Sequence, residues 1–123
     1  MKHLLIVEDD KNQRELYKEE LEGEGYRVST AENGESALKF LKKSKPDMVI
    51  LDISMPQMDG ITALGKILSK DKSLPVIFHT AYGSYKESFL TWSADAYIIK
   101  SARLDELKQK IKEIFQKRVL IKP

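Results

Sequence analysis

Short runs of consecutive apolar residues alternate along the chain with longer segments whose apolar residues recur at helical spacing. The unbroken runs are Leu4–Val7, Met48–Leu51, Val76–Phe78 and Ala96–Ile99, and the partial alternation of Tyr26–Ser29 marks one more short strand. Unbroken apolar runs of this length are typical of strands that are buried on both faces of a parallel sheet. The pattern therefore predicts five strands.

The segments between these runs predict five helices, each marked by a stripe of apolar residues. The stripes are Leu16, Tyr17 and Leu21; Ala37, Leu38, Phe40 and Leu41; Ile61, Leu64, Ile67 and Leu68; Phe89, Leu90 and Trp92; and Leu104, Leu107, Ile111, Ile114 and Phe115. Strands that alternate with helices indicate an α/β fold, with a doubly wound parallel sheet covered on both faces. Periodicity does not fix the strand order, but the flavodoxin-like order 2-1-3-4-5 is one of two common solutions and places the first and third strands side by side.

Composition limits the classes of function. The chain has 123 residues, 41% hydrophobic and 33% charged, so we expect one folded domain over residues 1–123. Its formal net charge of +2 gives no reason to expect direct binding to nucleic acid or membrane. No apolar stretch approaches the roughly 20 residues of a membrane span or forms a signal peptide. The absence of cysteine excludes thiolate catalysis and cysteine-ligated zinc, and it is compatible with a cytoplasmic location.

Acidic residues follow two of the apolar runs. Glu8, Asp9 and Asp10 come directly after the first run, and Asp52 follows the third. Ligands of open α/β sheets bind at the carboxyl ends of the strands, where these side chains would meet. Converging carboxylates repel each other unless a cation is bound, and a site made only of oxygen ligands favours Mg²⁺ before Ca²⁺. The pattern thus predicts a Mg²⁺ site.

Two further polar residues end apolar runs at the same end of the predicted sheet. Thr80 ends the fourth run and Lys100 follows the fifth. A hydroxyl and an ammonium beside Asp52 suit phosphoryl transfer, in which the carboxylate of Asp52 is the nucleophile. Taken singly, each residue also has a structural reading: the acidic residues could cap loops or a helix, Thr80 could be a turn residue and Lys100 could be solvated.

These residues belong to four motifs, which are Ile6-Val7-Glu8-Asp9-Asp10, Asp52-Ile53-Ser54-Met55-Pro56-Gln57-Met58-Asp59-Gly60, Thr80-Ala81 and Tyr97-Ile98-Ile99-Lys100. Through these motifs the sequence resembles a response-regulator receiver domain of bacterial two-component signalling. The resemblance extends from Leu4 to about Phe115. It implies a switch that catalyses only its own phosphorylation and dephosphorylation, and is not otherwise an enzyme.

The resemblance also implies roles for individual residues around the acidic group. Asp52 would accept a phosphoryl group from a phosphohistidine on a sensor histidine kinase or a histidine phosphotransferase. Asp9 would bind Mg²⁺ directly, Glu8 would bind it through water, and the backbone carbonyl of Ser54 would complete the protein ligands. The resemblance does not name the cognate kinase. It also leaves open whether the chain stands alone or belongs to a longer regulator with an output domain.

Further implied roles concern the switch. Thr80 would move toward the phosphoryl group on activation, with Tyr97 turning inward behind it, and Lys100 would contact the phosphoryl group. Ser54 and Tyr82 would line the approach to Asp52 and set the lifetime of the phosphorylated state. Partner proteins would bind at the surface of the fourth helix, fifth strand and fifth helix, which changes on activation. Trp92 either belongs to the core or forms part of that partner surface.

The sequence departs from the family after Lys100, where Ser101 replaces the usual proline, and at Ser93, where glycine is common. A degenerate receiver that folds without being phosphorylated is therefore an alternative. A Mg²⁺-dependent aspartyl phosphohydrolase is a weaker one, because Asp52-Ile53-Ser54 lacks the second aspartate of that motif. A flavodoxin-like cofactor binder is the weakest, since acidic residues stand where a phosphate loop is needed. We interpret His79 as a strand residue that faces a helix, not as a metal ligand.

Overall fold

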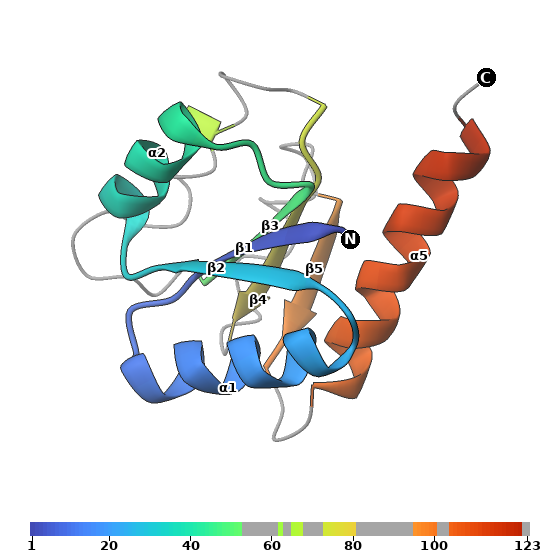
Figure 1. Ribbon diagram of the computed structural model, residues 1–123, viewed down its shortest axis with the longest axis horizontal. Coiled ribbons are helices and arrows are strands. Elements are labelled where there is room, and N and C mark those ends of the chain that lie inside the picture. The colour runs from blue at the N-terminus through green and yellow to red at the C-terminus, as the bar shows by residue number, and fades with distance from the viewer. Residues whose placement is uncertain (53–61, 63–64, 68–72, 81–94, 101–103, 122–123) are drawn as a thin grey trace.

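A computed structural model describes residues 1–52, 62, 65–67, 73–80, 95–100 and 104–121 of the chain (Figure 1). Within these residues, five strands form one parallel sheet in the order β2-β1-β3-β4-β5. The strands are β1 (His3–Val7), β2 (Arg27–Ala31), β3 (Met48–Leu51), β4 (Val76–Thr80) and β5 (Ala96–Ile99). The predicted flavodoxin-like sheet is confirmed, and with it the juxtaposition of the first and third strands.

Helices cover both faces of the sheet. Helices α1 (Lys11–Gly23) and α5 (Asp105–Ile121) lie on one face, and α2 (Gly34–Lys43) lies on the other (Figure 1). Residues 62 and 65–67 are helical, and Ile67 is buried on the same face as α2, as the predicted third helix requires. The predicted helix that carries Phe89, Leu90 and Trp92 lies outside the described residues. Among the described helices, none is long and apolar enough to cross a membrane.

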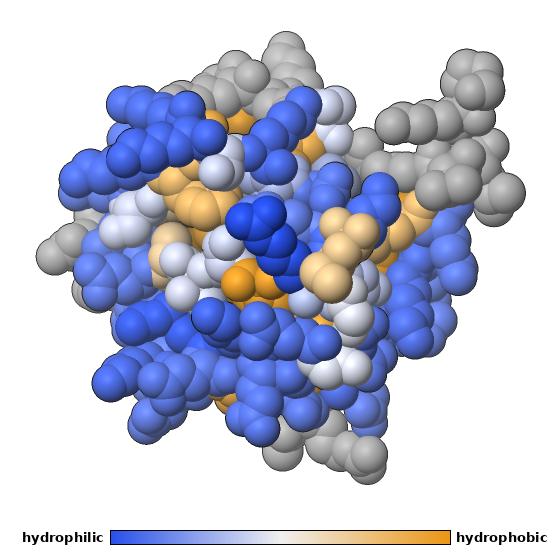
Figure 2. All heavy atoms as spheres, in the orientation of Figure 1, coloured by the Kyte–Doolittle hydropathy of each residue, from blue (hydrophilic) through white to orange (hydrophobic). Residues whose placement is uncertain are grey.

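Each central strand contributes to two separate apolar layers, which explains why its sequence does not alternate. Leu5 and Val7 of β1 pack toward α2, whereas Leu4 and Ile6 of the same strand pack toward α1 and α5. Figure 2 shows hydrophilic residues over the outer sides of α1 and α2, with hydrophobic residues visible between them. Both faces of the sheet are therefore core, and polar side chains along these strands gather where the strands end.

Two predictions about the first quarter of the chain are wrong in detail. The second strand runs over Arg27–Ala31 and not over Tyr26–Ser29, because it pairs with β1 from His3↔Arg27 to Val7↔Ala31 and extends as far as that partner does. Leu16, predicted to lie on the apolar stripe of the first helix, is 49% exposed. Tyr17 and Leu21 are four residues apart and share the buried face, whereas Leu16 lies about 100° around the helix from Tyr17.

Candidate functional site

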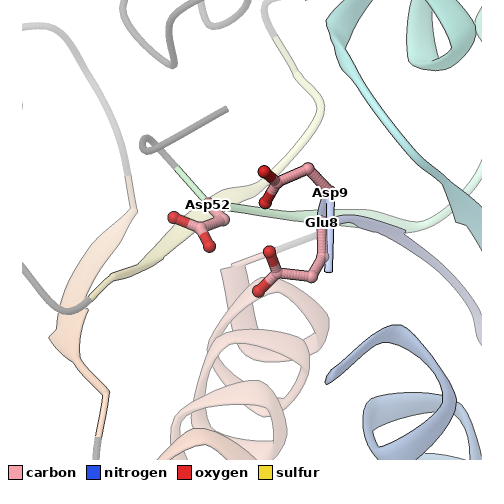
Figure 3. A group of neighbouring side chains, drawn as sticks. All are labelled: Glu8, Asp9 and Asp52. Atoms are coloured by element: carbon pink, nitrogen blue, oxygen red, sulfur yellow. The ribbon is translucent and has the colours of Figure 1, made fainter. Parts of the chain in front are cut away.

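Three carboxylates come together where β1 and β3 end. Glu8, Asp9 and Asp52 each offer one oxygen, and these oxygens all lie within 4.8 Å of one another. Figure 3 shows the side chains of Glu8 and Asp9 extending toward Asp52. The pairing of the two strands explains this convergence, because the Asp52 backbone N–H donates to the carbonyl of Val7 at 3.1 Å. Glu8 and Asp52 are buried and Asp9 is exposed, so the group is open on one side.

The ammonium group of Lys100 closes the buried side of this acidic cluster. Its Nζ lies 2.7 Å from Asp52 Oδ2 and 2.5 Å from Glu8 Oε1. The backbone positions it, since the Lys100 N–H donates to the carbonyl of Thr80 at 2.6 Å, just beyond the ladder between β4 and β5. Lys100 therefore lies beside Asp52, as the sequence predicts, and also beside Glu8, although Ser101 follows it in place of proline.

Burial and neighbouring charge shift the pKa values of this cluster. Burial, together with the carboxyl group of Asp52 beside it, raises the pKa of Glu8 to about 8. Burial opposes the charge on Lys100, but its hydrogen bonds to Asp52 and Glu8 outweigh burial and raise the pKa of the lysine. Without a bound cation, Glu8 thus retains a proton near neutral pH, while Lys100 stays charged.

The donor set fits a hard divalent cation. The three carboxylates supply oxygen ligands alone, and neither of the two histidines of the chain is among them. Mg²⁺ takes one or two protein carboxylates and keeps several waters, which suits a cluster that is exposed on the Asp9 side. Ser54, whose backbone carbonyl is the predicted fourth protein ligand, lies outside the described residues.

The loop that carries the acidic pair is fixed by the first turn of α1. Asp10 is the N-cap, and its side chain accepts the backbone N–H of Gln13 at 2.9 Å. The guanidinium of Arg14 reaches back and donates to the backbone carbonyls of Glu8 and Asp9, both at 2.9 Å. These bonds hold the loop backbone in the form that directs both carboxylates toward Asp52.

Sequence reasoning missed Arg14 and Gln13. An arginine one turn into a helix that follows an acidic loop is a recognisable candidate for holding the loop carbonyls. No comparable signal marks Gln13, an exposed polar residue near the start of a helix. Its side-chain oxygen nevertheless lies 2.5 Å from Lys100 Nζ, so within the described part of the chain Gln13 joins Glu8 and Asp52 as an acceptor of this ammonium.

The predicted switch residues lie on the strands next to the cluster. Thr80 is buried at the carboxyl end of β4. Tyr97 is half-buried on β5 and packs near Phe78, with ring centroids 6.2 Å apart. Their movement on activation stays a prediction, because it concerns a second state of the protein. Tyr82, predicted to influence the lifetime of the phosphorylated state, lies outside the described residues.

A buried tyrosine–histidine pair lies on the side of the sheet that faces α1. The hydroxyl of Tyr17 and Nδ1 of His79 are hydrogen-bonded, and the two rings meet edge to face with centroids 5.4 Å apart. Burial, with the charge of Lys100 nearby, lowers the pKa of His79 to about 4, and burial raises the pKa of Tyr17. His79 is therefore a neutral strand residue that faces a helix, as predicted.

Comparison with solved structures identifies close relatives of this arrangement. The crystal structure of the response regulator protein TrrA from Thermotoga maritima in complex with Mg²⁺-BeF has a TM-score of 0.88 and 48% sequence identity, and the match covers 93% of this chain and 99% of that one. The same regulator in complex with the histidine kinase ThkA matches with a TM-score of 0.85, over 93% of this chain and 98% of that one.

Comparison with curated proteins and family models agrees with the structural match. The probable transcriptional regulator ycf27 of Cyanidium caldarium is 39% identical over 94% of this chain, and the match covers 47% of that protein. The regulatory protein AtoC of Escherichia coli K12 is 39% identical over 85% of this chain and 23% of its own length, so the chain spans half or less of these relatives. The model of the response regulator receiver domain matches residues 4–112. The chain therefore belongs to the response regulator receiver family of two-component signalling.

Proposed function

We propose that Asp52 accepts a phosphoryl group from a phosphohistidine, on a sensor histidine kinase or a histidine phosphotransferase, within a cytoplasmic two-component system or phosphorelay. One observation carries the proposal. Glu8, Asp9 and Asp52 converge within 4.8 Å, and Lys100 Nζ lies 2.7 Å from the Asp52 carboxylate. The Asp52 carboxylate is therefore placed to act as a nucleophile. The negative charge of the phosphoryl group that it attacks would face the ammonium group of Lys100.

The transfer exchanges one bond for another at phosphorus. An oxygen of Asp52 attacks the phosphorus, the bond between phosphorus and the donor imidazole nitrogen breaks, and that nitrogen keeps the electron pair. Lys100 then turns one of its N–H groups to a phosphoryl oxygen, and the hydroxyl of Thr80 donates to another. In a second step water attacks the phosphorus, the bond between phosphorus and the Asp52 oxygen breaks, and inorganic phosphate leaves with the Asp52 carboxylate restored. The chemistry of this chain is limited to these two steps on its own Asp52.

The acidic residues would hold Mg²⁺ during transfer. Glu8, Asp9 and Asp52 would supply carboxylate oxygens, with the backbone carbonyl of Ser54 as a further ligand. When bound, the ion neutralises charge on the phosphoryl group that is being transferred. The capture of Mg²⁺-BeF by TrrA, which is 48% identical to this chain, supports the assignment.

Phosphorylation would shift a balance between two states of the domain. The favoured state has Thr80 and Tyr97 turned toward the phosphoryl group, and it changes the surface around β5 and α5. The complex of TrrA with the kinase ThkA supports a histidine kinase as the donor partner. The downstream partner or output domain is left unassigned.

The intact mass of the protein tests this function. The chain is incubated with acetyl phosphate, with and without Mg²⁺, alongside the Asp52→Asn variant. We expect one Mg²⁺-dependent phosphoryl adduct, about 80 Da by the elementary mass of the PO₃H group, on the wild type and none on the variant. If neither acetyl phosphate nor a histidine kinase donor gives an adduct on the wild type, the chain is a degenerate receiver and the proposal is wrong.

A further inference from the structure

The third donor of the Lys100 ammonium group points at α1. An ammonium has three N–H donors and no acceptor. Two of them face Glu8 Oε1 at 2.5 Å and Asp52 Oδ2 at 2.7 Å, and the third faces Gln13 Oε1 at 2.5 Å. Among the described residues that accept from Lys100, Gln13 is thus the one carboxamide beside two carboxyl groups, and it is the one that cannot carry a negative charge.

Gln13 is held on a part of the chain that has little freedom. Its backbone N–H is bound by the N-cap Asp10 at 2.9 Å, and the next residue, Arg14, ties the same helical turn to the carbonyls of Glu8 and Asp9. The carboxamide therefore projects toward Lys100 from a fixed base. A long, flexible lysine side chain gains most from such a partner, because it otherwise samples many rotamers.

We infer that Gln13 is a positioning residue for Lys100, which holds the ammonium group between Glu8 and Asp52 until the phosphoryl group arrives. The inference rests on the proposed function of Asp52. A neutral acceptor suits this task, since its hydrogen bond is weaker than one to a carboxylate and is the first to be given up. In the transfer step Lys100 keeps its carboxylate partners and redirects the N–H that Gln13 held toward a phosphoryl oxygen.

Removing the amide should slow phosphorylation by an amount that matches one hydrogen bond. We expect Gln13→Ala to lower the rate constant for phosphorylation by acetyl phosphate about five- to tenfold, because Lys100 is no longer held in the productive position. Asn12→Ala is the matched control, an exposed neighbour on the same turn of α1, and it should leave the rate unchanged.

A double-variant comparison separates positioning of Lys100 from any other role of Gln13. In a Lys100→Met background, Gln13→Ala should have no further effect on the rate, because the group on which it acts is gone. If the effect of Gln13→Ala is the same in both backgrounds, or if Gln13→Ala alone matches the wild type, Gln13 does not act through Lys100 and the inference is wrong.

A measurement without any phosphoryl donor tests the contact between Gln13 and Lys100 separately from the proposed function of Asp52. An ammonium whose three N–H groups are all bound exchanges slowly with water, so Lys100 should give a separate lysine side-chain signal in a ¹H–¹⁵N spectrum, identified by its loss in Lys100→Met. Gln13→Ala should abolish this signal, whereas Gln13→Glu, which retains an acceptor, should keep it. A signal that survives in Gln13→Ala would contradict the positioning role even if wild-type Asp52 is phosphorylated. Failure of Asp52 to be phosphorylated would leave this signal in place.

Discussion

Aspartates lie at both ends of the sheet, but they bind different partners. At the amino end, Asp47 and Asp95 are exposed and each binds the backbone of a neighbouring strand. The Asp47 carboxylate accepts the His3 N–H at 2.7 Å, and the Asp95 carboxylate accepts the Val76 N–H at 2.9 Å. The backbone N–H groups of the same aspartates donate back to the carbonyls of His3 and Val76. These carboxylates join the starts of adjacent strands.

At the carboxyl end, the carboxylates face each other and a cation. Asp52 and Glu8 are buried, Asp9 lies within 4.8 Å of both, and Lys100 Nζ contacts the first two. Such an arrangement gathers like charges, which a purely structural role would avoid. The comparison teaches that the groups around a carboxylate, more than its position beside a strand, separate an aspartate that caps a strand from one that carries chemistry.

The largest expected effect comes from removing the cation at the carboxyl end. We expect Lys100→Met to slow phosphorylation of Asp52 by acetyl phosphate on the order of 100-fold, because the developing charge loses its positioned donor. Lys108→Met is the matched control, since Lys108 pairs with Glu20 at 3.2 Å between α5 and α1, away from the acidic cluster. Its rate should equal that of the wild type, and its stability should change by less than about 1 kcal/mol. If the wild type, Lys100→Met and Lys108→Met are phosphorylated at equal rates, Lys100 has no role in phosphorylation that Lys108 lacks.

Each end of the sheet also holds a histidine, and the two differ in burial. His79 is buried against Tyr17, and burial lowers its pKa to about 4. Between pH 6.5 and 4 the unfolded chain therefore binds a proton at His79 that the folded chain does not, so this histidine lowers the unfolding free energy with falling pH by up to about 1.4 kcal/mol per pH unit. The raised pKa of Glu8 acts in the opposite direction down to about pH 4.5. Half-buried His3 donates or accepts at Ser29 Oγ, 2.8 Å away, and its pKa is lowered too, first by burial.

Urea unfolding at several pH values measures this difference. The double variant Tyr17→Phe/His79→Leu removes both polar partners, so its unfolding free energy should fall less with falling pH between 6.5 and 4 than that of the wild type. His3→Asn should keep most of the slope, because His3 is less buried. A slope that is unchanged in the double variant would mean that His79 titrates normally in the folded protein.

Much of this molecule could be predicted from its sequence, for a physical reason. The apolar runs are unbroken because both faces of β1, β3 and β4 are core, and polar residues are then confined to the strand ends. A reader of the sequence can therefore find Glu8, Asp9, Asp52, Thr80 and Lys100 without knowing the fold. Hydrophobic periodicity carries no information on pairing, so the strand order that brings them together is predicted as one of the two common arrangements of a doubly wound sheet and not from the pattern itself.

The contacts between side chains from distant elements could not be predicted. The sequence predicts a buried face for Tyr17 and for His79, but their hydrogen bond depends on how α1 lies across β4. The acceptor role of Gln13 depends on where the side chain of Lys100, 87 residues away in the chain, ends. The sequence alone also places Leu16 on the apolar stripe of the first helix, because an apolar residue beside Tyr17 fits a helical stripe equally well.

The proton on Glu8 allows a finer test of the acidic cluster. Because burial and Asp52 raise the pKa of Glu8 to about 8, Mg²⁺ binding below that pH must release this proton. We expect the Mg²⁺ affinity to rise with pH up to about 8, by as much as about tenfold per pH unit, and to level off above it. Glu8→Gln should bind Mg²⁺ more weakly at pH 9 and show little dependence on pH. Titration calorimetry at pH 6, 7, 8 and 9 measures the Mg²⁺ affinity of the wild type and of Glu8→Gln. If the affinity of the wild type does not change with pH, Glu8 does not hold a proton in this range.

The smallest change is expected from a comparison of two exposed aspartates, one from each end of the sheet. Asp47→Ala removes an acceptor from the His3 N–H and should lower the unfolding free energy by about 1 kcal/mol, with phosphorylation unchanged. Asp9→Ala removes a carboxylate from the acidic cluster and should do the reverse: stability without Mg²⁺ should be kept, and Mg²⁺-dependent phosphorylation should fall. Urea unfolding and intact mass, measured on both variants, give four values. If each variant lowers both stability and phosphorylation, the two ends of the sheet are not separable in function, and the distinction between capping and chemical aspartates does not hold for this protein.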